Sequence, residues 1–147
     1  YVEKALLDLY DVDKNPRWLE KARDFNALVL QRFLEQDSGK FLYAARAASS
    51  ASSSSSGSTQ ALASAKTYAT TDGTWPGAAG VAIENLIRLD ALPKVARDGT
   101  TGPDYLAIAR RSLAASGRAM QEDPVAHASM LVALERLLRV RTSFGQN

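Results

Sequence analysis

Apolar residues recur at helical spacing in five separate stretches of this chain, and this periodicity constrains the fold more than any other feature. The stretches begin near Val2, Pro16, Ala78, Leu106 and Pro124. No run of comparable length alternates between apolar and polar residues, as a half-buried strand would. We therefore expect an all-α fold of about five helices, with antiparallel neighbours wherever the connection is short.

The second stretch is the clearest helix. Asn15 offers a capping side chain, and Pro16 suits the first helical position. The residues that follow form one apolar stripe: Trp18, Ala22, Phe25, Val29 and Phe33. The stretch ends at Asp37-Ser38-Gly39, and residues 40–43 predict a brief extended segment.

The first and third stretches also indicate what lies next to them in the chain and in the fold. The first begins inside its pattern with no capping residue, so we expect the helix to start before Val2 and the chain to be a C-terminal fragment of a larger protein. The third runs from about Ala78 to Leu92 and is apolar on more than one side. Such a helix needs neighbours on several sides.

Serine and alanine dominate residues 44–65, which include an unbroken serine run from Ser52 to Ser56. This composition cannot bury enough apolar surface to offset the entropy of ordering the segment. We expect a disordered surface insertion. The alternative is a helix through the alanines, which serine disfavours by competing for backbone hydrogen bonds.

The composition indicates a soluble globular domain and excludes several partners. The chain is 46% apolar and 23% charged, and its net charge of +2 is spread along the sequence, so no cationic face is available for nucleic acid. No apolar run is long enough to cross a bilayer, and residues 1–4 do not resemble a signal peptide. There is no cysteine for disulfides, thiolate metal sites or thiol redox chemistry. We expect an intracellular or organellar protein that binds neither nucleic acid nor membranes.

The helical hairpins could stack side by side into a closed ring or into a solenoid, and no fixed sequence period favours the solenoid. Three motifs bear on this choice and cover nearly all of the chain outside the serine-rich segment. The first is Ala5-Leu6-Leu7-Asp8-Leu9-Tyr10, followed by Trp18-Leu19 and Ser38-Gly39-Lys40-Phe41. The second is Asp72-Gly73-Thr74-Trp75-Pro76, running into Val81-Ala82 and Asn85-Leu86-Ile87-Arg88-Leu89. The third is Pro124-Val125-Ala126-His127, before Leu131 and Ala133-Leu134.

Together these motifs resemble the C-terminal helical region of the thioredoxin-like spermatogenesis-associated proteins, a region similar to N-acylglucosamine epimerases and other six-hairpin toroids. The resemblance implies a partial (α/α)6 toroid, whose remaining hairpins and N-terminal thioredoxin-like domain lie outside this chain. One departure stands out. The family's turn continues Pro-Ser-Gly-Asn-Ser, whereas this chain has Pro76-Gly77-Ala78-Ala79-Gly80 and lacks the polar side chains that could orient a ligand.

Three residues are candidates for a central cleft of such a toroid. Asp72 could act as a general base or hold a sugar hydroxyl, Trp75 could stack on a sugar ring, and His127 could transfer protons near neutral pH. Each also has a structural interpretation. Asp72 would cap a turn, Trp75 would pack over the next helix, and His127 would satisfy backbone groups at a helix start.

No metal or other cofactor is predicted, because a single histidine without carboxylates at helical spacing cannot form a metal site. Five carboxylates of the first two stretches have no second carboxylate at a defined distance, as a glycosidase site would need, so we expect them on solvated helix faces. They are Glu3, Asp8, Asp11, Asp13 and Glu20.

Two functions remain open. The chain is either a non-catalytic scaffold or subunit segment, or part of a carbohydrate-binding or epimerase-like cleft lined by Asp72, Trp75 and His127. The loss of the polar turn residues favours the scaffold. Its partners would be the remaining hairpins of the same toroid or other protein chains, covering exposed faces such as those that carry Leu6 and Leu9 or Leu134 and Leu138.

Overall fold

Five α-helices and one 3-10 turn make up the fold among residues 1–45, 67–93 and 102–143, the part of the chain that the computed structural model describes. The elements are α1 (Val2–Asp13), α2 (Pro16–Phe33), α4 (Ala78–Ala91), α5 (Tyr105–Glu122), η1 (Val125–His127) and α6 (Ala128–Ser143). The described residues contain no β-strand, so the prediction of an all-α fold is confirmed. Closure into a ring stays a prediction.

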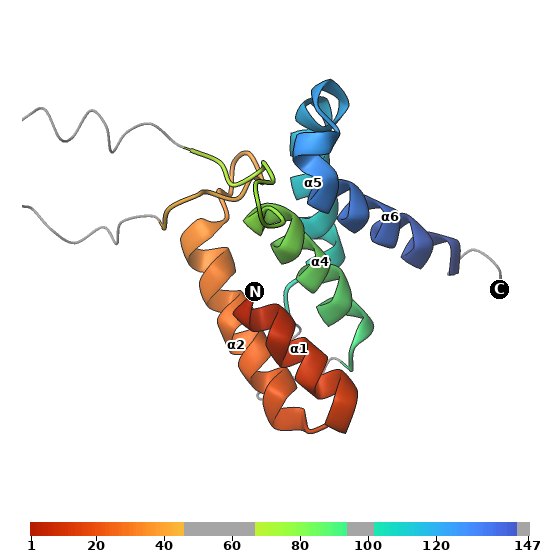
Figure 1. The fold of residues 1–147 in the computed structure, drawn as a ribbon. Helices are drawn as coiled ribbons and strands as arrows, with labels where there is room; N and C mark the ends of the chain where they lie inside the picture. The colour runs from red at the N-terminus through yellow and green to blue at the C-terminus, as the bar shows by residue number, and fades with distance from the viewer. Residues whose placement is uncertain (46–66, 94–101, 144–147) are drawn as a thin grey trace, which may run out of the picture.

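Helices α1 and α2 form a tight hairpin (Figure 1). Lys14 ends α1 in the left-handed conformation, with φ of 56°. The Asn15 side chain then accepts a hydrogen bond from the Arg17 amide at 3.1 Å, and Pro16 opens α2. The predicted helix start is therefore confirmed.

A short extended segment follows α2, as predicted. Leu34 pairs with Phe41, and Leu42 pairs with Tyr68, as isolated antiparallel bridges. These bridges hold the end of α2 beside residues 67–69, which lead into α4. The predicted serine-rich insertion falls between the two paired segments and, from residue 46 to its end, lies outside the described residues.

Helix α4 is the centre of the fold and packs against α1, α5 and α6 (Figure 1). Its buried apolar residues include Val81, Ile83, Leu86, Ile87 and Leu89. They point to more than one side of the helix, which confirms the expectation of neighbours on several sides. Helices α5 and α6 make the largest contacts with α4, and α1 makes a smaller one.

The structure corrects the buried face predicted for α2, and it leaves Leu9 of α1 exposed, as expected. In α2, Asn26 is buried while the predicted stripe residue Phe25 is 38% exposed. In α1, Leu7 is completely buried, and Leu9 is exposed. The apolar residues of α2 cover more of its circumference than α1 can bury, so the neighbouring helix, and not the periodicity, selects the core face.

The prediction that Glu3 lies on the surface is also wrong. Glu3 was expected on a solvated face, but it lies in the core with only 3% of its surface exposed. It shares one face of α1 with Leu7, one turn further along, and the packing that buries Leu7 buries Glu3 too. Among the described residues, no helix has both the length and the hydropathy needed to span a bilayer.

Candidate functional site

Asp72 lies in the turn before α4 and ties this turn to the start of α6. Its Oδ1 accepts hydrogen bonds from the Gly77 amide at 2.6 Å and from the Ser129 hydroxyl at 2.5 Å. Its Oδ2 accepts one from the Ser129 amide at 2.7 Å. The Asp72 amide in turn donates to the Ala126 carbonyl at 2.7 Å. Asp72 thus acts as a capping residue for α6 supplied from a distant part of the chain.

These contacts set the acidity of the Asp72 carboxyl. Partial burial alone would raise its pKa, but the hydrogen bonds from Ser129 and Gly77, with a further contribution from nearby His127, lower the pKa below its ordinary value. A carboxylate of low pKa with both oxygens occupied is a weak base. The geometry therefore favours the structural interpretation of Asp72, as a turn and cap residue.

His127 belongs to the same junction. It ends the 3-10 turn η1 and is buried, and its Nδ1 donates to the Asp123 carbonyl oxygen at 2.8 Å. Its Nε2 is also buried and has no hydrogen-bond partner in the part of the chain that the structure describes. The one ring nitrogen that could serve a substrate thus faces protein interior, which does not suit proton exchange with a ligand.

Trp75 lies apart from this pair. Its side chain is 75% exposed, so it does not pack over the start of α4. Its backbone carbonyl accepts a hydrogen bond from the Gly73 amide at 3.1 Å, and the next carbonyl, of Pro76, accepts one from the Tyr1 hydroxyl. The structure therefore brings Asp72 and His127 together and leaves the Trp75 ring in solvent.

Packing explains why glycine occupies positions 77 and 80, where the sequence lacks the polar residues of the family that it resembles. A β-carbon at Gly77 would lie 2.7 Å from Asp72 Oδ1, and one at Gly80 would lie 2.7 Å from the Ser129 Cβ. Residues 77 and 80 thus lie where the Asp72 turn and the start of α6 leave no room for side chains. The absence of polar groups at these two positions follows from packing in this chain.

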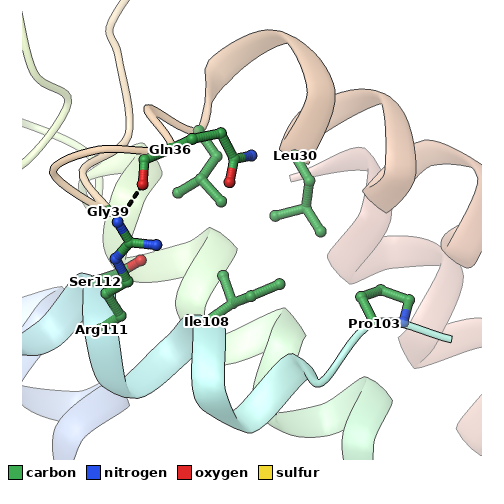
Figure 2. Close-up of a pocket in the computed structure, with 8 residues that line it drawn as sticks. Leu30, Gln36, Gly39, Pro103, Ile108, Arg111 and Ser112 are labelled. Carbon is green, nitrogen blue, oxygen red and sulfur yellow. Dashed lines mark hydrogen bonds between the residues drawn. The ribbon is translucent and has the colours of Figure 1, made fainter.

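A cleft of about 220 Å³ lies elsewhere, between the end of α2 and the start of α5 (Figure 2). Leu30 and Ile108 face each other across it, and Pro103 closes one side. The Arg111 guanidinium donates to the Gln36 carbonyl and, at 2.8 Å, to the Asp37 carbonyl. None of the three candidate residues lines this cleft.

The cleft offers little polar chemistry. Ser112 is its one polar side chain from the core, and the hydroxyl oxygen is buried out of reach of solvent. No group of three or more carboxylate or imidazole side chains within the described ranges could hold a metal ion. The geometry thus presents no convergent set of polar groups of the sort that fixes a small ligand.

No protein-family model matches this chain, and no curated protein or solved structure is significantly similar to it. The resemblance to the thioredoxin-like spermatogenesis-associated proteins therefore stays a prediction, and the candidate roles of Asp72, Trp75 and His127 stay predictions with it.

A buried polar cluster that no sequence pattern predicted lies between α1, α2 and α4. Asn26 Nδ2 donates to Glu3 Oε1 at 2.9 Å, and Asn85 also hydrogen-bonds the Glu3 carboxyl. Each of these residues is at least 97% buried, and they come from α2, α1 and α4 respectively. Burial is the main cause that raises the pKa of Glu3 to about 7, against smaller lowering contributions from the two asparagines, the chain's amino group and Arg88. The available signal was Asn85, a polar residue in a helix whose apolar residues cover more than one side.

Proposed function

We propose that this chain is a non-catalytic segment of an α/α toroid that serves as a scaffold or subunit, with neighbouring hairpins or other chains covering its outer helices. One observation carries the proposal. The helices at the two sides of the fold, α2 and α6 (Figure 1), expose large apolar side chains to solvent.

On α2, Phe25 and Leu28 are 38% and 49% exposed and lie three residues apart, on one face of the helix. On α6, Val132 and Leu138 are 55% and 50% exposed. Apolar side chains that gather on the outer helices of a small fold favour contact with another protein surface. Leu9 and Leu138 are exposed, as expected. Leu6 and Leu134 were also expected on exposed faces, but they are partly buried and pack against the core.

The Asp72 junction supports the non-catalytic part of the proposal. The Asp72 oxygens are used by Ser129 and Gly77, and the Nε2 of His127 is enclosed. Both residues thereby join the turn before α4 to the start of α6. The Asp72 carboxylate and the His127 ring therefore contribute to stability, and their polar atoms are not available to bind a substrate.

Sedimentation velocity over a range of concentrations tests the proposal. We expect the 147-residue chain alone to self-associate through its uncovered apolar faces. The double variant Phe25→Glu, Leu28→Glu should sediment closer to a monomer, at a loss of about 1–2 kcal/mol in the free energy of unfolding, because each side chain is also about half buried.

Tyr43→Glu is the control, since Tyr43 is also a large side chain, 76% exposed, but lies outside the helices that carry the exposed apolar faces. It should leave self-association unchanged. A wild-type chain that is monomeric at all concentrations and melts cooperatively would contradict the proposal.

The alternative is that the chain forms part of a carbohydrate-binding, epimerase-like cleft. The exposed Trp75 ring favours it, because an indole face in solvent can stack on a sugar ring. Titration with N-acetylglucosamine should then change the tryptophan fluorescence of the wild-type chain and leave a Trp75→Leu variant, which retains Trp18, unaffected. An unchanged spectrum in both proteins would argue against this alternative.

A further inference from the structure

The buried Glu3 carboxyl lies where three helices meet. Glu3 is on α1, Asn26 on α2 and Asn85 on α4, and these three side chains are 3%, 1% and 2% exposed. Both asparagines donate toward the carboxyl, and this leaves Asn26 Oδ1 and Asn85 Oδ1 buried with no hydrogen-bond partner among the described residues. The cluster therefore contains two unsatisfied acceptors beside a group that supplies a donor only when it carries a proton.

No basic side chain among the described residues forms a salt bridge with Glu3. The nearest basic side chain on α4 is Arg88, whose guanidinium is committed to Asp8 and Asp11 at 2.7 Å each. The other charged or titratable groups that act on this region are the amino group of Tyr1 on one side and Tyr105 of α5, with Arg23 and Asp90, on the other. An ionised Glu3 would thus be a buried charge stabilised mainly by two amide hydrogen bonds, with smaller contributions from the amino group and Arg88, and such charges are costly.

Protonation resolves both problems. A neutral carboxyl carries no buried charge, and its hydroxyl can donate to an asparagine Oδ1 once one side-chain amide rotates by half a turn. Donors and acceptors then match better than they do around a carboxylate.

We propose that Glu3, Asn26 and Asn85 form a buried proton-binding site that holds the α1–α2 hairpin against α4 when Glu3 is protonated and loosens this contact when Glu3 ionises. The site is independent of the proposed scaffold function, since it depends only on contacts within the chain. The pKa of Glu3, raised to about 7, would place the change near neutral pH.

The sign of the effect follows from linkage. Because the pKa of Glu3 is higher in the folded chain than its ordinary 4.5, the folded state binds the proton more tightly than the unfolded state does. The stability that Glu3 contributes is present below pH 4.5 and is lost as the pH rises to about 7. Through this window the unfolding equilibrium constant should rise by roughly tenfold per pH unit, about 300-fold in all.

Carbon-13 NMR of the Glu3 carboxyl in the full chain measures the site directly. We expect a titration midpoint near neutral pH, and we expect the amides of α1 to lose protection against hydrogen exchange over the same range, beyond the intrinsic pH dependence of exchange. Glu3→Gln keeps the shape of the side chain without the charge, and it should abolish this pH-dependent loss.

Glu122→Gln on α5 is the control, since Glu122 is exposed and pairs with Arg118 of the same helix. It should leave the pH dependence of α1 exchange as in the wild type. A Glu3 midpoint near 4.5, or the same loss of α1 protection in wild type and Glu3→Gln, would overturn the proposal. If Glu3→Gln does not fold, the NMR midpoint of the wild-type chain decides alone.

Discussion

Gly80 of α4 lies so close to Ser129 of α6 that a β-carbon on residue 80 would be 2.7 Å from the Ser129 carbonyl carbon. This crossing joins the central helix to the last helix, next to the junction that Asp72 makes with the same serine. The hydrogen bonds between Asp72 and Ser129 therefore depend on Gly80, eight positions after the aspartate, because only a glycine lets the two helices approach this closely.

Gly80→Ala should therefore destabilise the chain by about 2 kcal/mol or more, because the added methyl group must push α4 and α6 apart. Urea unfolding measures the change. Gly117→Ala is the matched control: Gly117 is also in a helix, α5, but a β-carbon there meets nothing within 4 Å. It should stabilise the chain by roughly 0.5–1 kcal/mol. Equal effects of the two substitutions would mean that helix propensity, and not the crossing, governs both sites.

Asp72→Asn should lower the free energy of unfolding by about 2 kcal/mol. The NH2 group of asparagine would face the backbone N–H of Gly77 or of Ser129, where the carboxylate oxygen accepts a hydrogen bond. Asp104→Asn provides the comparison. Asp104 caps α5 through a single hydrogen bond to the Ala107 amide at 2.9 Å, and asparagine is an equally good cap, so a loss of only a few tenths of a kcal/mol is expected.

The same junction should respond to acid. Since the pKa of folded Asp72 is below its ordinary value, its contribution to stability is present above the ordinary carboxyl range and is lost as the pH falls through the lowered pKa. Part of the acid-induced loss of stability in the wild-type chain should be missing in Asp72→Asn. Identical acid titrations of the free energy of unfolding in the two proteins would exclude this role.

Arg88→Lys should weaken the contact between α4 and α1 by about 1 kcal/mol. The Arg88 side chain is mostly buried and bonds Asp8 and Asp11 at 2.7 Å each, and a lysine ammonium cannot reproduce this forked geometry. Arg118→Lys, in an exposed pair with Glu122 on α5, should change stability by less than about 0.5 kcal/mol. Thermal melts of both variants distinguish the two cases, and a larger loss for Arg118→Lys would contradict the argument.

Gly39→Ala should cost about 1–2 kcal/mol. Gly39 has φ of 74°, which disfavours any β-carbon, and an added one would lie 2.8 Å from the Cγ of Arg111. This change would also disturb the hydrogen bonds from Arg111 to the Gln36 and Asp37 carbonyls. Gly73→Ala is the control, because a β-carbon at Gly73 meets no atom within 4 Å. Chemical denaturation should find Gly73→Ala close to the wild type.

The sequence by itself determined the helices. The cap at Asn15, the proline at position 16 and the apolar period of residues 78–92 are local signals, and local hydrogen bonding and side-chain spacing act on them in any tertiary context. The all-α class followed for the same reason. Asp72 was also recognisable as a turn residue, because its glycine neighbour marks a turn.

Only the tertiary structure decided which helix faces are buried and which polar groups meet. Glu3 and Asn26 are 23 residues apart and Asp72 and Ser129 are 57 apart, so no local pattern could indicate that they form hydrogen bonds. Glu3 in particular looks like a solvated residue until α2 and α4 close over it. The period of a helix shows which residues share a face. Whether that face is buried depends on which distant parts of the chain pack against it.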